Sequence, residues 1–134
     1  MERKIDMVSY VLDASALLVL LKGEMGGDKV IAALKEGAAI SAINFSEVIA
    51  KLNESSMPEE AIHEALDFLE LDIVGFDTQN AYKAGLLRLV TKRAGLSLGD
   101  RACLALAQQL SVPAITADRI WEGVVPDVVV KVIR

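Results

Sequence analysis

Five short apolar segments alternate along this chain with longer segments that have helical periodicity. This alternation constrains the fold more than any other feature, because successive strands joined by helices form a mainly parallel sheet through right-handed crossovers. The predicted strands cover residues 8–13, 38–43, 72–76, 112–118 and 127–133. The predicted helices cover residues 15–21, 28–37, 44–55, 57–71, 77–95 and 97–110. We therefore expect an α/β fold with a mainly parallel central sheet flanked by helices.

The length of 134 residues, without a repeat or a low-complexity linker, predicts a single domain over residues 1–134. Hydrophobic residues make up 53% of the chain, and the mean hydropathy is +0.40. We expect some of this apolar excess to cover a partner surface. Insertion into a membrane is not expected, because no run approaches the roughly 18 uncharged apolar residues of a spanning helix.

Charge and cysteine content restrict the function further. The net charge is −5 and the pI is about 4.9, so contact with nucleic acid requires a local basic patch or a bridging metal. The same acidity suits a basic partner. The N-terminal sequence MERKIDMVSYV has no apolar signal core before Asp6, which favours a cytoplasmic protein. A single cysteine, Cys103, excludes an internal disulfide and a cysteine-based metal cluster.

Four acidic residues fall at positions where this topology places ligands. Asp13 ends the first predicted strand, Glu47 lies in the first turn of the helix after the second strand, and Asp118 follows the fourth strand. Asp100 begins the helix that leads into that fourth strand. Ligands of open parallel sheets bind outside the carboxyl ends of the strands. We therefore expect these four carboxylates to converge at one edge of the sheet.

Each acid also has a purely structural explanation as a helix cap or a turn residue. The positions concerned are Asp13, Asp118 and the capping-box pairs Ser97–Asp100 and Asn44–Glu47. As a set, however, converging carboxylates repel, and two charges about 4 Å apart cost about 4 kcal/mol at an effective dielectric near 20. A divalent cation removes this cost, and an all-oxygen ligand set selects Mg²⁺ or Mn²⁺.

A metal site of this kind suits hydrolysis of a phosphodiester, because the metal activates water and neutralises the developing charge. Other chemistries lack their residues. The only histidine, His63, lies in the predicted helix 57–71 away from the acids, and Cys103 lies within an apolar helix. The chain contains no G-x-S-x-G elbow, no Walker A loop and no G-x-G-x-x-G motif.

Two hydroxyl residues and two arginines accompany the acids. Ser15 follows Asp13 by two residues and Thr116 precedes Asp118 by two, so each is placed to orient a carboxylate or hold water; capping and strand propensity are the competing explanations. Arg101 and Arg119 each directly follow a predicted ligand. We expect these two arginines to contact RNA phosphates, although salt bridges to the neighbouring acids would explain them too.

Four segments together resemble the PIN domain, and most closely the VapC toxin ribonucleases. They are YVLDASALLVLL, ISAINFSEVIAKL, LSLGDRACLALA and ITADRIW, in this order along nearly the whole chain. The resemblance implies a three-layer PIN fold and a Mg²⁺-dependent endoribonuclease, the toxin of a toxin–antitoxin pair. It maps the acidic site onto Asp13, Glu47, Asp100 and Asp118, with metal ligands at Asp13, Asp100 and Asp118 and the accompanying hydroxyl at Thr116. It also implies a homodimer and a cognate antitoxin whose basic or aromatic tail enters the acidic groove.

Three alternatives stay open at this point. A PIN nuclease that processes RNA without an antitoxin would have the same acids. A PIN module that binds metal or RNA without catalysis is a different class, which the intact acids disfavour. A response-regulator receiver is another small α/β domain with an acidic Mg²⁺ site, but it requires adjacent acids after the first strand and a lysine near the last acid. The segments AAISAINF and PAITADRI contain neither feature.

Overall fold

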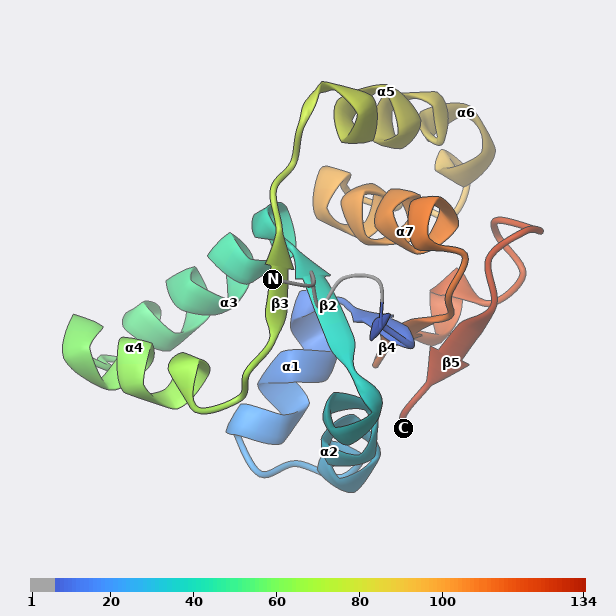
Figure 1. The fold of residues 1–134 in the computed structure, drawn as a ribbon. Helices are drawn as coiled ribbons and strands as arrows, with labels where there is room; N and C mark the ends of the chain where they lie inside the picture. The colour runs from blue at the N-terminus through green and yellow to red at the C-terminus, as the bar shows by residue number, and fades with distance from the viewer. Residues whose placement is uncertain (1–6) are drawn as a thin grey trace.

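The centre of the molecule is a sheet of five parallel strands (Figure 1). The computed structural model describes residues 7–134, so residues 1–6, on which the cytoplasmic expectation depends, lie outside the described residues. The strands are β1 (Tyr10–Leu12), β2 (Ala38–Ser41), β3 (Asp72–Val74), β4 (Ala114–Thr116) and β5 (Val130–Val132). Their order across the sheet is β3-β2-β1-β4-β5, and every neighbouring pair is parallel. The predicted α/β class with a parallel sheet is confirmed.

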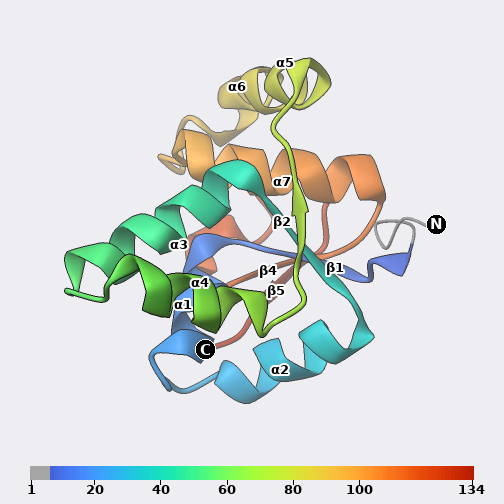
Figure 2. The same ribbon diagram turned by 60° about the vertical axis from the view of Figure 1, so that its left-hand side comes forward.

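Helices cover both faces of this sheet, which confirms the predicted three-layer arrangement (Figures 1 and 2). The helices are α1 (Ala14–Leu21), α2 (Gly27–Glu36), α3 (Ala42–Glu54), α4 (Glu59–Asp67), α5 (Thr78–Leu86), α6 (Arg88–Thr91) and α7 (Leu98–Leu110). Helices α1 and α2 lie against one face, whereas α7 lies against the other face with α5 and α6 outside it (Figure 1). Helices α3 and α4 project as a pair beyond β2 and β3.

The two layers of core follow from the alternation of side chains along β1. Leu12 belongs to the apolar cluster under α1, α2 and α3, and its neighbours across the sheet are Ile40 and Ile115. Val11 points the other way, into the cluster formed with Leu104 of α7. Neither Leu12 nor Val11 has any exposed surface. Since successive strand residues face opposite sides, a strand buried on both faces must be continuously apolar, as this one is.

Helix α3 begins two residues earlier than the sequence predicts. Its cap is Ser41, whose hydroxyl accepts a hydrogen bond from the amide of Ile43 at 3.2 Å. The prediction that Asn44 caps this helix, as part of an N-x-x-E capping box, is wrong because Asn44 lies inside the first turn. Strand β2 is correspondingly shorter than predicted and ends at Ser41.

The predicted long helix over residues 77–95 is divided into α5 and α6. At the break, Leu87 has a ψ of −14°, far from the helical value of about −42°. The hydroxyl of the buried Thr91 donates to the Leu87 carbonyl at 2.8 Å, in addition to the backbone bond that Thr91 makes there. Back-bonding of a threonine to the carbonyl four residues earlier bends helices.

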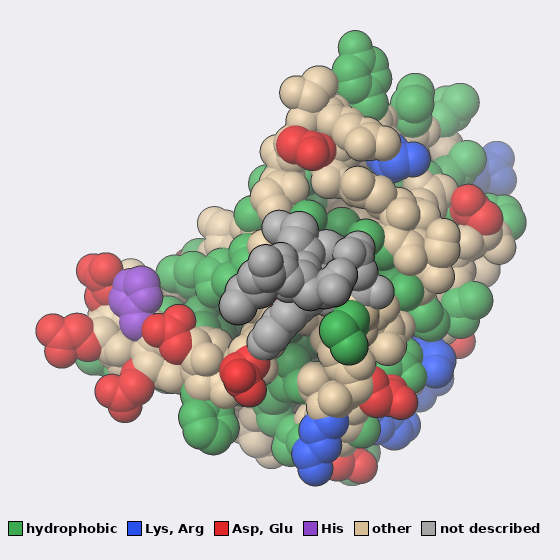
Figure 3. Space-filling view, in the orientation of Figure 1, with side chains coloured by type: hydrophobic (Ala, Val, Ile, Leu, Met, Phe, Trp, Pro, Cys, Tyr) green, Lys and Arg blue, Asp and Glu red, His purple; other side chains and the backbone are tan. Residues whose placement is uncertain are grey.

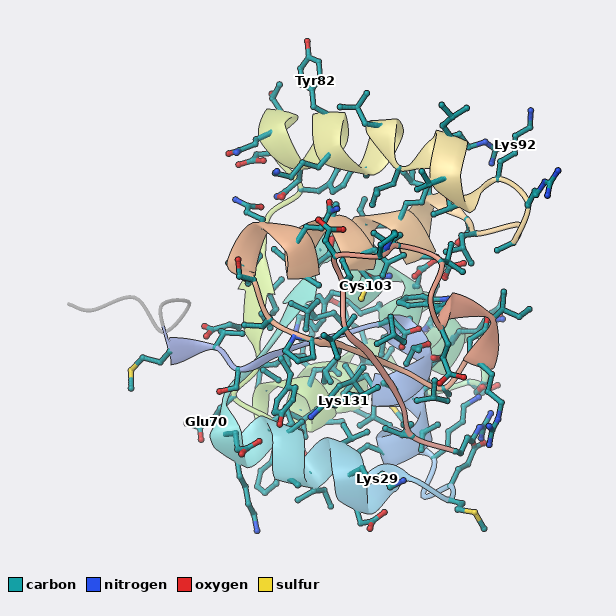
Figure 4. All side chains as sticks on the ribbon, turned by 90° about the vertical axis from the view of Figure 1, so that its right-hand side faces the viewer. Lys29, Glu70, Tyr82, Lys92, Cys103 and Lys131 are labelled. Carbon is teal, nitrogen blue, oxygen red and sulfur yellow. The ribbon has the colours of Figure 1, made fainter. Side chains whose placement is uncertain are left out.

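The outer face of α5 and α6 exposes an apolar surface formed by Tyr82, Leu86, Leu89 and Val90, each between 54% and 84% exposed. Figure 4 shows Tyr82 pointing away from the body of the molecule. Part of the apolar excess in the composition is therefore on the surface. Among the helices of residues 7–134, none combines the length and apolarity needed to cross a membrane.

Packing on α7 predicts that alanine substitutions at two leucines of this helix have very different effects on the free energy of unfolding. Leu104 is fully buried against the sheet, whereas Leu98 is 49% exposed. Replacing Leu104 with alanine should lower the free energy of unfolding by about 3 kcal/mol, because it removes buried methyl groups and leaves a cavity. Leu98→Ala, the matched control, should change it by less than about 0.5 kcal/mol. Urea denaturation followed by circular dichroism measures both, and equal effects would contradict this account of the core.

Candidate active site

The four acids identified in the sequence line one cavity of about 380 Å³ at the carboxyl ends of β1, β2 and β4. The residues lining it are Asp13, Ala14, Ser15, Leu18, Asn44, Glu47, Ala50, Lys51, Glu54, Asp100 and Asp118. We call this space the acid cavity. Parallel strands bring their carboxyl ends to the same edge, and α3 and α7 begin at that edge, so residues far apart in sequence meet there.

Asp13 is the buried acid of the acid cavity and is held by hydrogen bonds from two elements. Its Oδ1 accepts from the amide of Ala16 at 2.8 Å and from the Ser15 hydroxyl at 2.8 Å. Its Oδ2 accepts from the Thr116 hydroxyl at 2.7 Å. The amide of Ala117 in turn donates to Ser15 at 3.0 Å, and the amide of Asp118 donates to Thr116 at 3.0 Å. Both hydroxyls are therefore oriented by the backbone after β4, with their protons directed at Asp13.

Burial dominates the electrostatics of Asp13. It raises the pKa of this carboxyl to about 6 from an ordinary value of 3.8. The hydrogen bonds from Thr116, Ala16 and Ser15 lower this pKa, and the negative charge of Asp100 raises it. A carboxylate that is both buried and close to another acid gains from a nearby cation.

Of the other three acids, Asp100 lies at a helix start and Asp118 at a turn, whereas Glu47 lies in the second turn of α3 and not in its first turn as predicted, because α3 begins at Ala42. Asp100 completes a capping box with Ser97, in which its carboxylate accepts from the Ser97 amide at 3.0 Å. Asp118 caps the 3-10 turn Arg119–Trp121 by accepting from the Ile120 amide at 3.0 Å. Glu47 is exposed and accepts from the side chain of Asn44 at 3.0 Å. Capping and lining of the cavity are thus compatible roles for these acids, because a carboxylate can cap a helix or turn and still face the cavity.

The acid cavity fits a hard divalent cation such as Mg²⁺ or Mn²⁺, since five carboxylates line it and no histidine or cysteine does. Within residues 7–134, no three acidic, histidine or cysteine side chains are close enough to form a ready-made cation cage. Each carboxylate is turned toward the amide or hydroxyl that it accepts from. Cation binding here would therefore replace some of these hydrogen bonds.

The two predicted RNA contacts are placed differently. Arg119 is exposed on the 3-10 turn next to Asp118. Arg101 does not line the acid cavity; its guanidinium donates to the Ala84 carbonyl of α5 at 2.9 Å. The expected contact of Arg101 with RNA phosphates at this cavity therefore disagrees with its position, because one residue along a helix turns the side chain by about 100° away from Asp100.

Sequence reasoning missed three cavity residues on α3. Asn44, predicted as a cap, is buried within the helix, and Lys51 and Glu54 were not considered. Positions 44, 47, 51 and 54 follow the spacing of one helical face, which is the signal that would have identified them. Lys51 is the one basic residue among those that line the cavity.

His63 and Cys103 take no part in this site. His63 is exposed on α4, with Nε2 3.4 Å from Glu59. Cys103 is buried in the interior (Figure 4), and burial, followed by the charges of Asp13, Asp100 and Glu47, raises the pKa of its thiol well above the ordinary value. The thiol therefore stays protonated and cannot act as a nucleophile. The predicted structural roles of both residues are confirmed.

A second, larger hollow of about 620 Å³ lies between α3 and α4 and shares Ala50 with the acid cavity. We call it the α3–α4 groove. Its apolar lining is formed by Phe45, Ile49, Ala50, Ile62, Leu66 and Ile73. Glu59, His63 and Asp67 border it. Figure 3 shows acidic side chains gathered around the histidine at this end of the molecule.

Residues 10–125 match the family model of the PIN domain. Among solved structures, a toxin–antitoxin complex from Klebsiella pneumoniae contains a chain that is 24% identical, with a TM-score of 0.72 over 90% of this chain and 96% of that one. DNA-bound VapBC from Salmonella typhimurium gives 20% identity and a TM-score of 0.75 over 96% and 100% of the two chains. VapBC-1 from nontypeable Haemophilus influenzae gives 20% identity and a TM-score of 0.72, over 92% of this chain and 96% of that one. These structures share the fold, and no curated protein sequence matches this chain.

The buried charge of Asp13 predicts how stability responds to pH without divalent ions. Folded Asp13 holds its proton up to about pH 6, whereas the unfolded chain releases it near 3.8. Stability should therefore fall as pH rises through this window and then level off. Asp13→Asn removes this fall and should raise the free energy of unfolding at pH 7.5 by about 3 kcal/mol.

Thermal unfolding in EDTA between pH 4 and pH 8 measures the effect. The control is Asp28→Asn, the same change at an exposed helix start. A wild-type and an Asp13→Asn protein with parallel pH profiles would contradict the raised pKa of Asp13.

Proposed function

Because the chain belongs to the PIN domain family, we propose that it is a metal-dependent endoribonuclease that hydrolyses phosphodiester bonds of RNA. The observation that carries this proposal is the convergence of Asp13, Glu47, Asp100 and Asp118 on one cavity. These acids are supplied by four separate segments of the chain, so their convergence is a property of the fold.

In this proposal, Asp13, Asp100 and Asp118 hold Mg²⁺ or Mn²⁺. The bound cation would supply activation of water and neutralisation of the charge that develops on the phosphate. Ser15 and Thr116 keep the Asp13 carboxylate in one orientation through their hydroxyl protons. Glu47, which is exposed, accepts the proton of the attacking water. No side-chain nucleophile is required, in agreement with the exposed His63 and the protonated Cys103.

RNA must approach this site against the negative charge of the protein. The net charge is −5, and five of the cavity-lining residues are acidic. Local cations are therefore needed to contact phosphates. Lys51 lines the cavity itself, and Arg119 lies on the turn next to Asp118. We assign the phosphate contacts to these two residues and give Arg101 a structural role between α5 and α7.

We further propose that the protein is the toxin of a toxin–antitoxin pair and acts in the cytoplasm. The solved structures that share its fold include VapBC complexes. The α3–α4 groove has an apolar floor and acidic borders, and it meets the acid cavity at Ala50. This arrangement suits an antitoxin with an amphipathic helix followed by a basic segment. The exposed apolar surface of α5 and α6 suits a homodimer contact.

Cleavage and metal binding test the nuclease proposal together. We expect a single-stranded RNA to be cut in Mg²⁺ or Mn²⁺ and to stay intact in EDTA, whereas DNA of the same sequence stays intact throughout. Asp13→Asn should reduce the rate by at least about a hundredfold, because metal affinity depends on the charge of the ligands. Either cation should raise Tm by binding the folded state, and Asp100→Asn should shrink this shift.

Asp28→Asn controls for loss of one negative charge outside the cavity and should cleave like the wild type. A folded Asp13→Asn protein with normal activity would disprove the site assignment. A Tm that does not respond to millimolar Mg²⁺ and Mn²⁺ would disprove the cation site.

The phosphate contacts can be separated from structural roles by their response to salt. Lys51→Ala and Arg119→Ala should each weaken RNA binding and lower the slope of log affinity against log salt by about one. Arg101→Ala should leave this slope unchanged and lower Tm, because its guanidinium bonds to α5. RNA binding measured across a salt series in Ca²⁺ gives all three slopes. Unchanged slopes for Lys51→Ala and Arg119→Ala would rule out their contact with phosphate.

A further inference from the structure

Glu47 is an exposed residue whose carboxylate nevertheless has a defined place. Burial does not hold it, since the side chain is exposed on α3. Its Oε1 accepts a hydrogen bond from Nδ2 of Asn44 at 3.0 Å, one turn earlier on the same helix. The orientation of Glu47 therefore depends on a specific polar contact.

Asn44 connects this carboxylate to α7. Its Nδ2 also donates to the carbonyl of Gly99 at 3.0 Å, so both amide protons have acceptors. The residue is 1% exposed, and its Oδ1 has no hydrogen-bond partner within residues 7–134. An unpaired buried carbonyl costs free energy, so Asn44 is not an optimal choice for stability alone.

Gly99 provides the space that the Glu47 carboxylate occupies. A Cβ built on Gly99 would overlap both Glu47 oxygens and lie 2.8 Å from the carboxylate carbon. The backbone of Gly99 is helical, without the positive φ that favours glycine. Glycine is therefore required at position 99 by the space that Glu47 occupies, and not by the backbone conformation. As a result, the Glu47 carboxylate sits against the residue directly before Asp100.

We propose that Asn44 and Gly99 are positioning residues that together hold the Glu47 carboxylate beside the first turn of α7. The catalytic consequence rests on the proposed nuclease function. A free glutamate side chain loses rotamer freedom when it must adopt one orientation during reaction. The Asn44 bond and the Gly99 gap restrict it beforehand, so Glu47 faces the acid cavity next to Asp100 before substrate arrives.

The competing explanation is that Asn44 only ties α3 to α7, and that Gly99 is merely tolerated. Substitution of Gly99 separates the two explanations. Alanine is a better helix former than glycine, so Gly99→Ala should keep or raise Tm, because the overlapping atoms belong to the movable end of Glu47. If Gly99 positions Glu47, the same variant should lose about tenfold or more in cleavage rate, because Glu47 is the proposed proton acceptor.

Two matched controls accompany these variants. Gly85→Ala makes the same exchange inside α5, where a Cβ meets nothing within 4 Å. Asn80→Leu removes a second buried asparagine that has an unpaired Oδ1 within the described chain and does not line the acid cavity. Neither control should alter the cleavage rate. Asn44→Leu keeps the branched outline of the side chain, removes both donated hydrogen bonds, and should reduce the cleavage rate about tenfold.

A mutant cycle shows whether Asn44 acts through Glu47. In a Glu47→Ala background, Asn44→Leu should cause no further loss of cleavage rate. Equal losses in both backgrounds would overturn the proposal and leave Asn44 a structural tie. Mn²⁺ affinity is measured by calorimetry and cleavage by gel, with Tm recorded for every variant.

NMR of the Asn44 side-chain amide tests the arrangement without metal or RNA. Glu47→Ala should shift one of its two Nδ2 proton resonances and leave the other, which is bonded to Gly99, in place. Gly99→Ala should shift the Glu47-bonded proton as well. Two unchanged resonances would overturn the positioning role. If the wild-type protein binds no Mn²⁺, only the nuclease proposal is overturned. The NMR experiment still tests the position of Glu47, because it requires no metal.

Discussion

The burial of one carboxylate, Asp13, determines how the site is built. A charged group removed from water is tolerated only if hydrogen bonds or a counter-charge compensate it. Here the compensation comes from the first turn of α1 and from the end of β4, through Ser15 and Thr116. The same bonds join α1 to β4 across the edge of the sheet. Their geometry leaves a negative charge in place, which a cation can neutralise.

Helix α7 combines the stability of the fold with the geometry of the site. Its middle is buried against the sheet through residues such as Leu104, so the helix axis has little freedom to move. Its first turn, which carries Gly99 and Asp100, borders the acid cavity. The capping box that begins the helix also limits the orientation of Asp100. A packed core element therefore presents the residues that border the acid cavity, which is the arrangement that precise positioning requires.

Most of the fold was predictable, because apolar segments and helical periodicity are properties of the local sequence. The failures arise where tertiary contacts compete with local signals. Asn44 is of a residue type that commonly caps helices, but Ser41 already caps α3. The side chain of Asn44 instead donates a hydrogen bond from α3 to the Gly99 carbonyl of α7. Residues 77–95 have helical periodicity, but the helix is interrupted at Leu87, whose carbonyl also accepts from the hydroxyl of the buried Thr91. Arg101 adjoins an acid in sequence and turns toward α5 in space.

The sequence by itself determined the alternation of strands and helices, the parallel sheet and the identity of the four acids. These follow from side-chain type and spacing along the chain. Only the tertiary structure decided which groups face those acids: the hydroxyl of Thr116 on Asp13, the amide of Asn44 on Glu47, and the gap at Gly99. The contacts at Thr116 and Gly99 join elements that lie far apart in the chain, so no local pattern encodes them. Asn44 and Glu47 share one face of α3, but the burial of Asn44 and its bond to Gly99 depend on how α3 and α7 pack together.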